Sequence, residues 1–443
     1  MLSHEDNELL CRVGPGTPMG EVLRRYWLPV LTSEELPEPD CPPVRAKLLG
    51  EELVAFRDTN GTVGLVDNYC PHRRASLFFG RNEECGLRCV YHGWKFDVEG
   101  HCVDMPSEPS ESNFKDKVKV KAYPTVDRGG TIWTYMGPKH LQPEFFNLQI
   151  WDYPDSHIIT SRVQSDSNYI QVIEGNIDSS HISFLHRNLA DLDMSDFDDG
   201  TDEVGFPSNK MSTKIRGADR FPRVIVQETK YGWRYVGLRD TPNGHNHLRI
   251  TTNIFPICQM IARLPSQGPG VLMMVPRDDE TCWRWSVSAR TDRPYTQEER
   301  DDRARNAANV TDIHGRGEKG YWNDYMLSRE DQRTLSFTGI KGIGTQDQAV
   351  TESMSTISDK QNEHLGTSDR AIIHNRKVLI DAARNMLEGI EPLYHDPGIT
   401  GKVRSHEENI PYGDDWRLYG AFAGEDEGCL LYTSDAADER SSV

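Results

Sequence analysis

The sequence has no excess of positive charge, because 50 Lys and Arg residues stand against 69 Asp and Glu residues, a formal net charge of −19. A nucleic-acid partner requires a basic face, so this balance predicts that the chain does not bind nucleic acid. The chain also lacks any apolar run near the roughly twenty residues that a membrane-spanning helix needs, and no membrane association is expected. The acidity itself is interpreted as a source of solubility rather than as a docking face for a partner.

Several further features are missing. There is no glycine-rich G-x-G-x-x-G motif for a flavin or nicotinamide nucleotide, so electrons for any redox chemistry must come from a separate protein. Residues 1–6 contain acids but neither a basic nor an apolar region, so no secretory signal peptide is expected. The nine cysteines form no regular disulfide framework, which indicates a reducing cytoplasm. Cys85 and Cys102 could pair, but cytosolic disulfides are rare and free thiols are preferred.

Two short Cys-His pairs dominate what the sequence does contain. Cys70 and His72 form a C-x-H motif, and after the sixteen residues from Arg73 to Arg88 come Cys89 and His92 in a C-x-x-H motif. A [2Fe–2S] cluster of Rieske type is held by two thiolates and two imidazoles, so this layout predicts such a cluster. Neutral imidazoles raise the potential of the cluster, which lets it accept electrons from a ferredoxin-level donor. A Cys2His2 zinc site is the alternative, although zinc sites usually pair Cys with Cys and His with His.

A β-rich domain is predicted around the two Cys-His pairs. Apolar runs at 53–56 and 63–66 flank an Asn-Gly pair at 60–61, which is the strongest short-range signal for a β-hairpin. The two Cys-His segments then fall on loops, at 67–74 and 87–96. A closing strand at 131–136 stops at Gly137 and Pro138, a boundary signal. We therefore expect an all-β cluster domain over residues 26–138, preceded by an N-terminal segment, residues 1–25, that packs on the domain that follows.

The next part of the chain, residues 139–428, predicts a larger α+β domain. Helical patterns occupy residues 168–187, 296–308 and 369–389, the last with apolar residues at helical spacing and a glycine stop. Strand-like runs separated by Pro and Gly turns fall at 223–227, 233–236, 248–254, 259–264 and 283–287. A helix, an antiparallel sheet and a long return helix make an α+β fold of helix-grip type, with one face of the sheet covered.

Two segments have unusual compositions. Residues 188–203 contain no Lys or Arg but seven acids, and a solvated loop is the simpler interpretation of this run. If the run instead covers a substrate pocket, it would repel a dianion and favour a neutral or monoanionic substrate. Residues 429–443 fit neither the preceding pattern nor a capping signal, and they resemble a translated sequencing-adaptor artefact. This tail is predicted to be non-native and without function.

Asp178, His181 and His186 form a second constellation, D-x2-H-x4-H. Two His and a carboxylate on one face of an iron(II) make the facial triad of non-haem oxygenases, which leaves positions open for O2 and substrate. On a straight helix the two His side chains would lie about 140° apart, so the helix must bend or break between them. Alone the motif is weak, because polar residues on a surface helix explain it equally well. Beside a Rieske cluster it predicts a mononuclear iron, and the rival classes are an electron carrier without that iron and a zinc hydrolase.

With these motifs the chain resembles the large subunit of the Rieske non-haem iron aromatic-ring oxygenases, in the branch that includes phthalate and phenoxybenzoate dioxygenases. The resemblance extends from Gly14 to about residue 395. Its specific matches are the segments 14–20, 25–30, 174–181 and 363–369.

The resemblance implies a role for each matching residue. His181 and His186 match the two imidazoles that bind the iron, and Asp178 matches the carboxylate that connects the iron environment to a cluster-bound His of a neighbouring subunit. The third iron ligand is a later Asp, for which Asp347 is the best match. Asp359 and Asp369 are the alternative candidates for this ligand, but an acid near the start of a helix is explained equally by capping of that helix. The cluster ligands implied are Cys70, His72, Cys89 and His92.

The implied function is that of the oxygenase component of a two-centre system. One [2Fe–2S] cluster and one iron(II) per chain use O2, and electrons come from a separate reductase with its own flavin and ferredoxin-type cluster. The reaction implied is cis-dihydroxylation of an aromatic compound, with aromatic carboxylates among the candidates; O-demethylation of an aryl ether or another monooxygenation is the alternative. The family forms homotrimers or stacked trimers, in which the cluster of one subunit approaches the iron of the next, and Asp178 would bridge to a cluster ligand such as His92.

Overall fold

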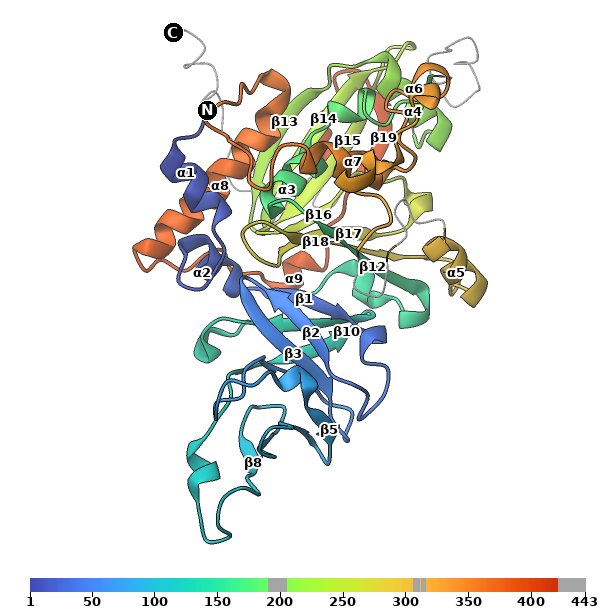
Figure 1. Cartoon of the computed structure of the whole chain (residues 1–443). Coiled ribbons are helices and arrows are strands. Elements are labelled where there is room, and N and C mark those ends of the chain that lie inside the picture. The colour runs from blue at the N-terminus through green and yellow to red at the C-terminus, as the bar shows by residue number, and fades with distance from the viewer. Residues whose placement is uncertain (190–204, 306–310, 312–315, 421–443) are drawn as a thin grey trace. The chain divides into compact units, whose positions relative to one another are not determined.

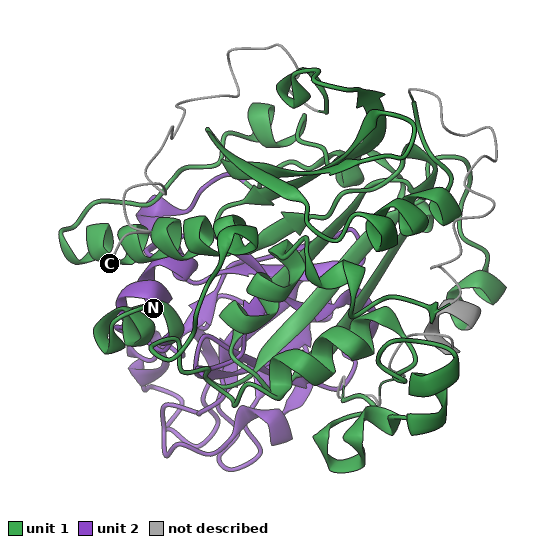
Figure 2. Cartoon of the chain, turned by 90° about the horizontal axis from the view of Figure 1, so that it is seen from above, with its two compact units in different colours: residues 1–11, 145–274, 280–443 green, residues 12–144, 275–279 purple. Residues whose placement is uncertain are grey.

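The computed structural model describes residues 1–189, 205–305, 311 and 316–420, with the backbone alone for residues 302–305. These residues form two compact units, which Figure 2 colours separately. Unit 1 contains Met1–Cys11, Phe145–Met274 and the part of the chain from Glu280 onward; unit 2 contains Arg12–Glu144 and Val275–Asp279. The predicted N-terminal segment is thus divided at Cys11 between the two units. The predicted tail and nearly all of the acidic run at 188–203 lie outside the described residues.

Unit 2 is built from short antiparallel strands, as expected for the all-β domain. Helix α2 (Pro18–Arg24) precedes a three-stranded sheet of β1 (Trp27–Thr32), β11 (Thr131–Tyr135) and β10 (Thr125–Arg128). A second sheet has the order β2 (Val44–Leu48), β3 (Glu51–Arg57), β4 (Val63–Asp67) and β9 (Ala122–Tyr123). A third has the order β5 (Arg81–Glu83), β6 (Gly86–Arg88), β7 (Lys95–Phe96) and β8 (Cys102–Asp104).

The predicted hairpin is confirmed. Strands β3 and β4 pair antiparallel from Leu53 opposite Asp67 to Arg57 opposite Val63. Gly61 adopts a positive φ of 82° in the turn between them, a conformation that glycine adopts without strain. The inner faces of these strands join one hydrophobic core with the two cluster loops, made of Val54, Phe56, Val66, Leu77, Leu87, Trp94, Phe96 and the two cysteines Cys70 and Cys89, among others.

Unit 1 contains an eight-stranded antiparallel sheet, the predicted centre of the larger domain (Figure 1). Its order is β12 (Ile158–Ser165), β18 (Cys282–Ala289), β17 (Gly270–Pro276), β16 (Cys258–Met260), β15 (His245–Ile254), β14 (Gly232–Asp240) and β13 (Arg223–Thr229), with β19 (His406–Pro411) also paired to β15. Five of these strands overlap the predicted runs, but β16 ends at Met260 rather than at 264. β12, β17 and β19 were not predicted.

Helices cover part of this sheet. α3 (Tyr169–Ile177) packs against β18, and the long α8 (Arg370–Leu387) packs against β13, α3 and the N-terminal α1 (His4–Cys11). α8 buries Ile372, Leu379 and Ala383 on one face, as its apolar spacing predicts. The remaining helices are α4 (Asn209–Ala218), α5 (Gln297–Arg305), α6 (Arg329–Thr334), α7 (Ile343–Glu352) and α9 (Pro397–Thr400). Of these, α7 contacts α3, which brings residues 343–352 beside the D-x2-H-x4-H segment.

One predicted helix is wrong in extent. The helical pattern at 168–187 is helix only as far as Ile177, and a short 3-10 turn at His181–Ser183 follows. The helix begins where the Asn168 side chain accepts a hydrogen bond from the Ile170 N–H, a regular N-cap. It ends because Asp178 adopts an extended backbone, with ψ 113°, instead of continuing the helix. The two histidines therefore lie on a turn rather than on a straight helix.

Candidate metal centres

Each of the two predicted cluster loops is closed by two backbone hydrogen bonds, in the same arrangement in both loops. In the first, Cys70 N–H donates to Ala75 O and Arg74 N–H donates to Cys70 O, each at 2.9 Å. In the second, Cys89 N–H donates to Trp94 O at 2.8 Å and Gly93 N–H donates to Cys89 O at 2.9 Å. The chain reverses through a left-handed residue at the same place in both loops, with φ 61° at Arg74 and 80° at Gly93.

This construction brings the four predicted cluster ligands together. Cys70 and Cys89 are each 2% exposed, and the rings of His72 and His92 lie 4.4 Å apart between centroids. The His72 ring is further held by stacking on Trp94, also at 4.4 Å. The sequence thus places two thiols and two imidazoles on two matched loops.

The electrostatics of these side chains fit a metal cluster. Burial, with the Cys89 thiol alongside, raises the pKa of Cys70 to about 11, so an ionised thiolate there requires a cation. Burial and the neighbouring His72 lower the pKa of His92, which favours the neutral imidazole that a metal binds. Cys85 and Cys102 are both free thiols, so the less favoured disulfide between them is excluded.

The second site begins where α3 ends. Asp178 Oδ1 accepts hydrogen bonds from Ser180 N–H at 2.6 Å and from His181 N–H at 3.3 Å. These bonds stabilise the turn after α3, because Asp side chains form such local turns readily. The turn directs the His181 side chain toward that of His186 and removes the angular separation of a straight helix.

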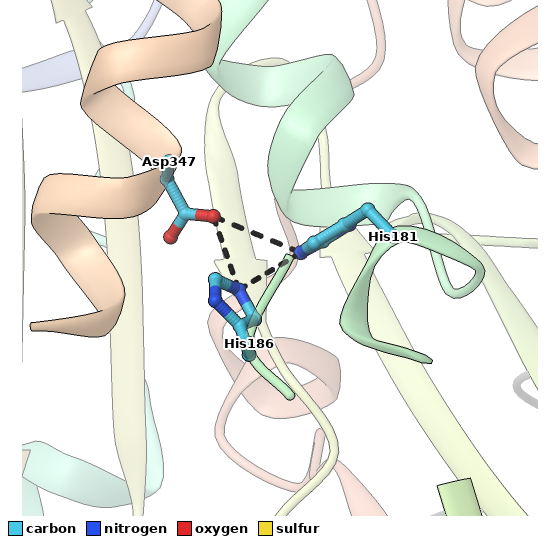
Figure 3. A group of neighbouring side chains, drawn as sticks. All are labelled: His181, His186 and Asp347. Atoms are coloured by element: carbon cyan, nitrogen blue, oxygen red, sulfur yellow. Dashed lines mark hydrogen bonds and ion pairs between the residues drawn. The ribbon is translucent and has the colours of Figure 1, made fainter. Parts of the chain in front are cut away.

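Three side chains converge at this point, as Figure 3 shows. His181 Nε2 lies 3.1 Å from His186 Nε2, and Asp347 Oδ1 from α7 lies 3.1 Å from His186 Nε2 and 3.7 Å from His181 Nε2. Among the described residues, these three form the one group of His, Cys, Asp and Glu side chains whose ligand atoms all lie within 4.8 Å of one another, as a single metal ion requires. Two imidazole nitrogens and one carboxylate oxygen are the donor set of the facial triad. The residues present therefore fit an iron(II), although their assignment as ligands stays a prediction.

Asp347 is held as an anion. Burial opposes its ionisation, but the His186 ring, together with the charges of Arg284 and His181, keeps the pKa of the carboxyl below its usual value. Arg284, on β18, lies 3.9 Å from Asp347 Oδ2 and donates to Gly344 O at the start of α7. The two alternative acids are used locally instead, since Asp359 accepts from Gln361 N–H and Asn362, and Asp369 from Gly366 N–H.

Asp178 lies on the opposite side of the His181 ring from Asp347. Its Oδ2 is 3.7 Å from His181 Nδ1, whereas the metal-facing atom is Nε2. Burial opposes ionisation of Asp178, but the His181 ring and the turn N–H groups lower the pKa of the carboxyl overall. This placement suits an outer partner of His181 rather than a ligand of the ion.

Two residues near the site have roles that sequence reasoning missed. Gln346 Oε1 lies 2.7 Å from His186 Nδ1, and Arg376 on α8 binds Glu174 through Nε at 2.7 Å and Nη2 at 2.8 Å. Arg376 also pairs with Glu363 at 2.7 Å, which joins the two segments 174–181 and 363–369 across the fold. Neither a lone Gln nor a lone Arg carries a motif that would have identified it.

His181 and Asp347 of the triad line a cavity of about 940 Å³. Apolar side chains form much of its wall, and the carboxylates of Glu174, Asp178, Asp359 and Glu363 lie around it with a single arginine, Arg376. The guanidinium of Arg187 backs the aromatic part of the wall, with its carbon 5.7 Å from the ring centroid of Phe184 and 4.8 Å from that of Phe337. The apolar part of the lining is Phe184, Leu185, Leu327, Phe337, Ile340, Val350, Met354, Leu365 and Ile372.

Two known protein families match this chain, each over a different region. A family described as the Rieske [2Fe-2S] domain matches residues 26–124, and one described as LigXa C-terminal domain like matches residues 134–439. No helix in the described parts of the chain is long and apolar enough to cross a membrane.

Individual relatives cover nearly the whole chain. The chain is 39% identical over 431 residues to the phthalate 4,5-dioxygenase oxygenase subunit of Pseudomonas putida, covering 95% of each. It is 32% identical to the 5,5'-dehydrodivanillate O-demethylase oxygenase subunit of a Sphingobium species, covering 91% of this chain and 86% of the relative. The solved structure of dicamba monooxygenase bound to dicamba has a similar fold, with a TM-score of 0.56 at 16% identity over 83% of this chain and 99% of that one.

Proposed function

Because this chain belongs to the Rieske non-haem iron oxygenases, as an oxygenase subunit with a [2Fe–2S] cluster and a mononuclear iron, we propose that it oxidises an aromatic substrate at the site formed by His181, His186 and Asp347. The observation that carries this proposal is the convergence of two imidazoles and one buried carboxylate beside an apolar cavity. The proposed cluster ligands are Cys70, His72, Cys89 and His92. The proposed domains remain 26–138 for the cluster and 139–428 for catalysis, with the N-terminal segment before them.

The protein's own residues prepare this site in three ways. Bound there, the iron would supply the centre for O2 activation, with electrons stored on the cluster. Asp347 stays ionised against burial because His186 and Arg284 lie beside it. Asp178 builds the turn that presents His181. The apolar wall excludes water and receives an aromatic ring.

The charges around the cavity favour a neutral or monoanionic aromatic substrate. Arg376 is already paired with two of the lining carboxylates, so it offers no free charge to a dianion. Arg187 supplies one positive charge behind Phe184 and Phe337, and no described residue accepts a hydrogen bond from its Nε or Nη1. One cation beside several carboxylates suits a single carboxylate on the ring better than two. A benzoate-type monocarboxylate is therefore the proposed substrate class.

Electron delivery is proposed to occur between copies of the chain. In a ring of three subunits, or stacked trimers, closed by head-to-tail contacts, Asp178 would accept a hydrogen bond from a cluster-bound imidazole such as His92 of the neighbouring copy. A separate reductase with a flavin and a ferredoxin-type cluster would supply the electrons. The eight described cysteines are all free, which fits the proposed location in a reducing cytoplasm. A role in the catabolism of aromatic compounds is proposed with it.

The reaction is proposed to be cis-dihydroxylation, and O-demethylation of an aryl ether is the second candidate. The relative named as a phthalate dioxygenase supports the first, and the relative named as an O-demethylase supports the second. The choice depends on how the substrate is oriented in the cavity, because both reactions use the same triad.

A single-turnover experiment tests the proposal without the reductase. The purified protein is reduced chemically in the absence of air, given a panel of aromatic monocarboxylates and methoxybenzoates, and exposed to O2. A dihydrodiol identifies the dioxygenase, whereas loss of a methyl group or a single added oxygen identifies the second candidate. Iron is counted on the same sample, and about three irons per chain are expected, against about two for a bare Rieske carrier. A full complement of iron with no oxygenated product from a broad panel would contradict the proposed activity.

A further inference from the structure

We propose that Gln346 is a positioning residue, which fixes the tautomer and orientation of His186 and so determines how tightly the mononuclear iron is held. Gln346 is 7% exposed, and its Oε1 lies 2.7 Å from His186 Nδ1. The inference rests on the proposed function, because it takes His186 to be an iron ligand. It adds a residue that is not itself a ligand.

The orientation of the Gln346 amide follows from its second contact. Its Nε2 donates a hydrogen bond to Ile340 O at 2.8 Å, so its Oε1 is the atom that faces the His186 ring. An amide oxygen can only accept hydrogen bonds, and His186 Nδ1 must therefore carry the ring proton. In the neutral imidazole that a metal binds, the lone pair is then on Nε2, the atom on the side of Asp347 Oδ1.

Helix α7 consequently holds the His186 ring from both of its nitrogens. Gln346 binds Nδ1, and the next residue, Asp347, lies 3.1 Å from Nε2. Because the two contacts come from adjacent residues of one helix, the ring cannot rotate without breaking at least one of them. The backbone of α7 thus fixes the direction of the Nε2 lone pair as well as the position of the carboxylate.

His181 has no equivalent support. Its Nδ1 is buried, and no described residue forms a hydrogen bond with it; Asp178 Oδ2 lies 3.7 Å away. The two imidazoles of the site therefore differ. His186 is held in place by a neutral amide, whereas His181 faces a carboxylate at a distance that leaves its orientation less restricted. Removal of the Gln346 acceptor should consequently weaken the better-fixed half of the site.

The test measures iron binding rather than turnover. The mononuclear iron is removed from the full-length protein with a chelator, the cluster is kept, and Fe2+ is titrated back without air. Loss of an outer hydrogen-bond partner of a metal-binding His typically weakens metal binding by about 10- to 100-fold, so Gln346→Leu should show a loss of that size. Gln346→Glu keeps an acceptor at the same place and should bind Fe2+ at least as tightly as the natural protein.

Gln348 offers a matched control on the same helix. It is 4% exposed, and its Nε2 donates to Glu352 at 2.8 Å and to Gln164 O at 3.4 Å, away from the metal-binding side chains. Gln348→Leu removes the same amide from the same helix and should leave Fe2+ affinity unchanged. The visible absorbance of the cluster reports on the integrity of unit 2 in every variant.

The outcomes separate this inference from the proposed function. If Gln346→Leu binds Fe2+ like the natural protein, or if Gln348→Leu weakens binding equally, the positioning role is wrong. His186→Ala is the reference: if it too binds Fe2+ normally, the iron site itself is misassigned. Should Gln346→Leu not fold, Gln346→Asn is the second variant, because it keeps the amide but shortens its reach. It should weaken Fe2+ binding, and an unchanged affinity would overturn the positioning role.

Discussion

Arg376 is the side chain whose loss should most disturb the fold around the site. Its guanidinium binds both oxygens of Glu174 at 2.7 and 2.8 Å, and Glu363 at 2.7 Å. The side chain of Arg376 is 4% exposed and that of Glu174 is 11% exposed. Arg376→Met fills a similar volume but leaves the Glu174 carboxylate buried beside an uncharged neighbour.

The expected loss follows from that burial. Breaking a buried ion pair by removal of one partner costs about 3–5 kcal/mol, because the remaining charge stays uncompensated. For a unit of this size about 1 kcal/mol corresponds to about 2–4 °C in the unfolding midpoint, so a loss of about 3 kcal/mol predicts a decrease of about 6–12 °C. Thermal unfolding followed by circular dichroism measures this change, and the cluster absorbance reports separately on unit 2.

Arg384, two turns further along α8, is the matched control. It pairs with Asp6 at 2.5 Å, but its side chain is 55% exposed, and exposed pairs contribute about 0–1 kcal/mol. Arg384→Met should therefore lower the midpoint by about 2–4 °C at most. Equal midpoints for Arg376→Met and Arg384→Met would refute the argument that burial gives the Glu174 pair its importance. A Glu174→Gln, Arg376→Met double variant should recover part of the loss, because no uncompensated carboxylate is then left buried at position 174.

Three further results are expected. Asp347→Ala should lose the mononuclear iron and keep the cluster, which iron counting and the cluster absorbance measure; retained iron and turnover would exclude Asp347 as a ligand. Asp178→Asn should keep both metal centres but suppress electron transfer, so that a reduced cluster fails to reoxidise in single turnover with substrate; unchanged turnover would refute the bridge. Benzoate should be turned over in preference to phthalate, because one cation, Arg187, lies behind the aromatic wall of a cavity that several carboxylates line; equal turnover of phthalate and a neutral analogue would contradict this charge argument.

The sequence predicted the chemistry of the site better than its local structure. Cys-His spacing encodes a ligand set directly, and the presence of the cluster is confirmed by the family to which the chain belongs. The helix at 168–187 was wrong in extent, because Asp178 ends it through hydrogen bonds to Ser180 and His181 that a helical pattern does not reveal. That same break is what lets the two histidines converge.

Two of the three missed strands, β17 and β19, have physical explanations. The sequence of β19 does not show an alternating apolar pattern, because its buried positions include the polar Glu407 and Asn409. These two residues are satisfied from β15, where Arg249 pairs with Glu407 at 3.1 Å and His247 lies 2.8 Å from Asn409. β17 reads as a short continuous apolar run, which periodicity alone cannot assign to strand or helix. For β19 the partner strand β15 is distant in sequence, whereas β17 pairs with the neighbouring β16.

The two oxygens of Asp178 have separate surroundings, and this division allows one residue both to build the turn and to serve on the proposed route for electrons. Oδ1 is occupied by the N–H groups of Ser180 and His181, which fix the backbone after α3. Oδ2 faces His181 Nδ1 at 3.7 Å, beyond direct hydrogen-bond distance, so it remains able to accept from a donor outside this chain. An Asn at this position can keep the first task through its carbonyl oxygen, but it presents an N–H2 group where the second task needs an acceptor. The turn and the iron ligands should therefore survive a change that removes the bridge, and this is the reason that loss of electron transfer without loss of iron identifies the role of Asp178.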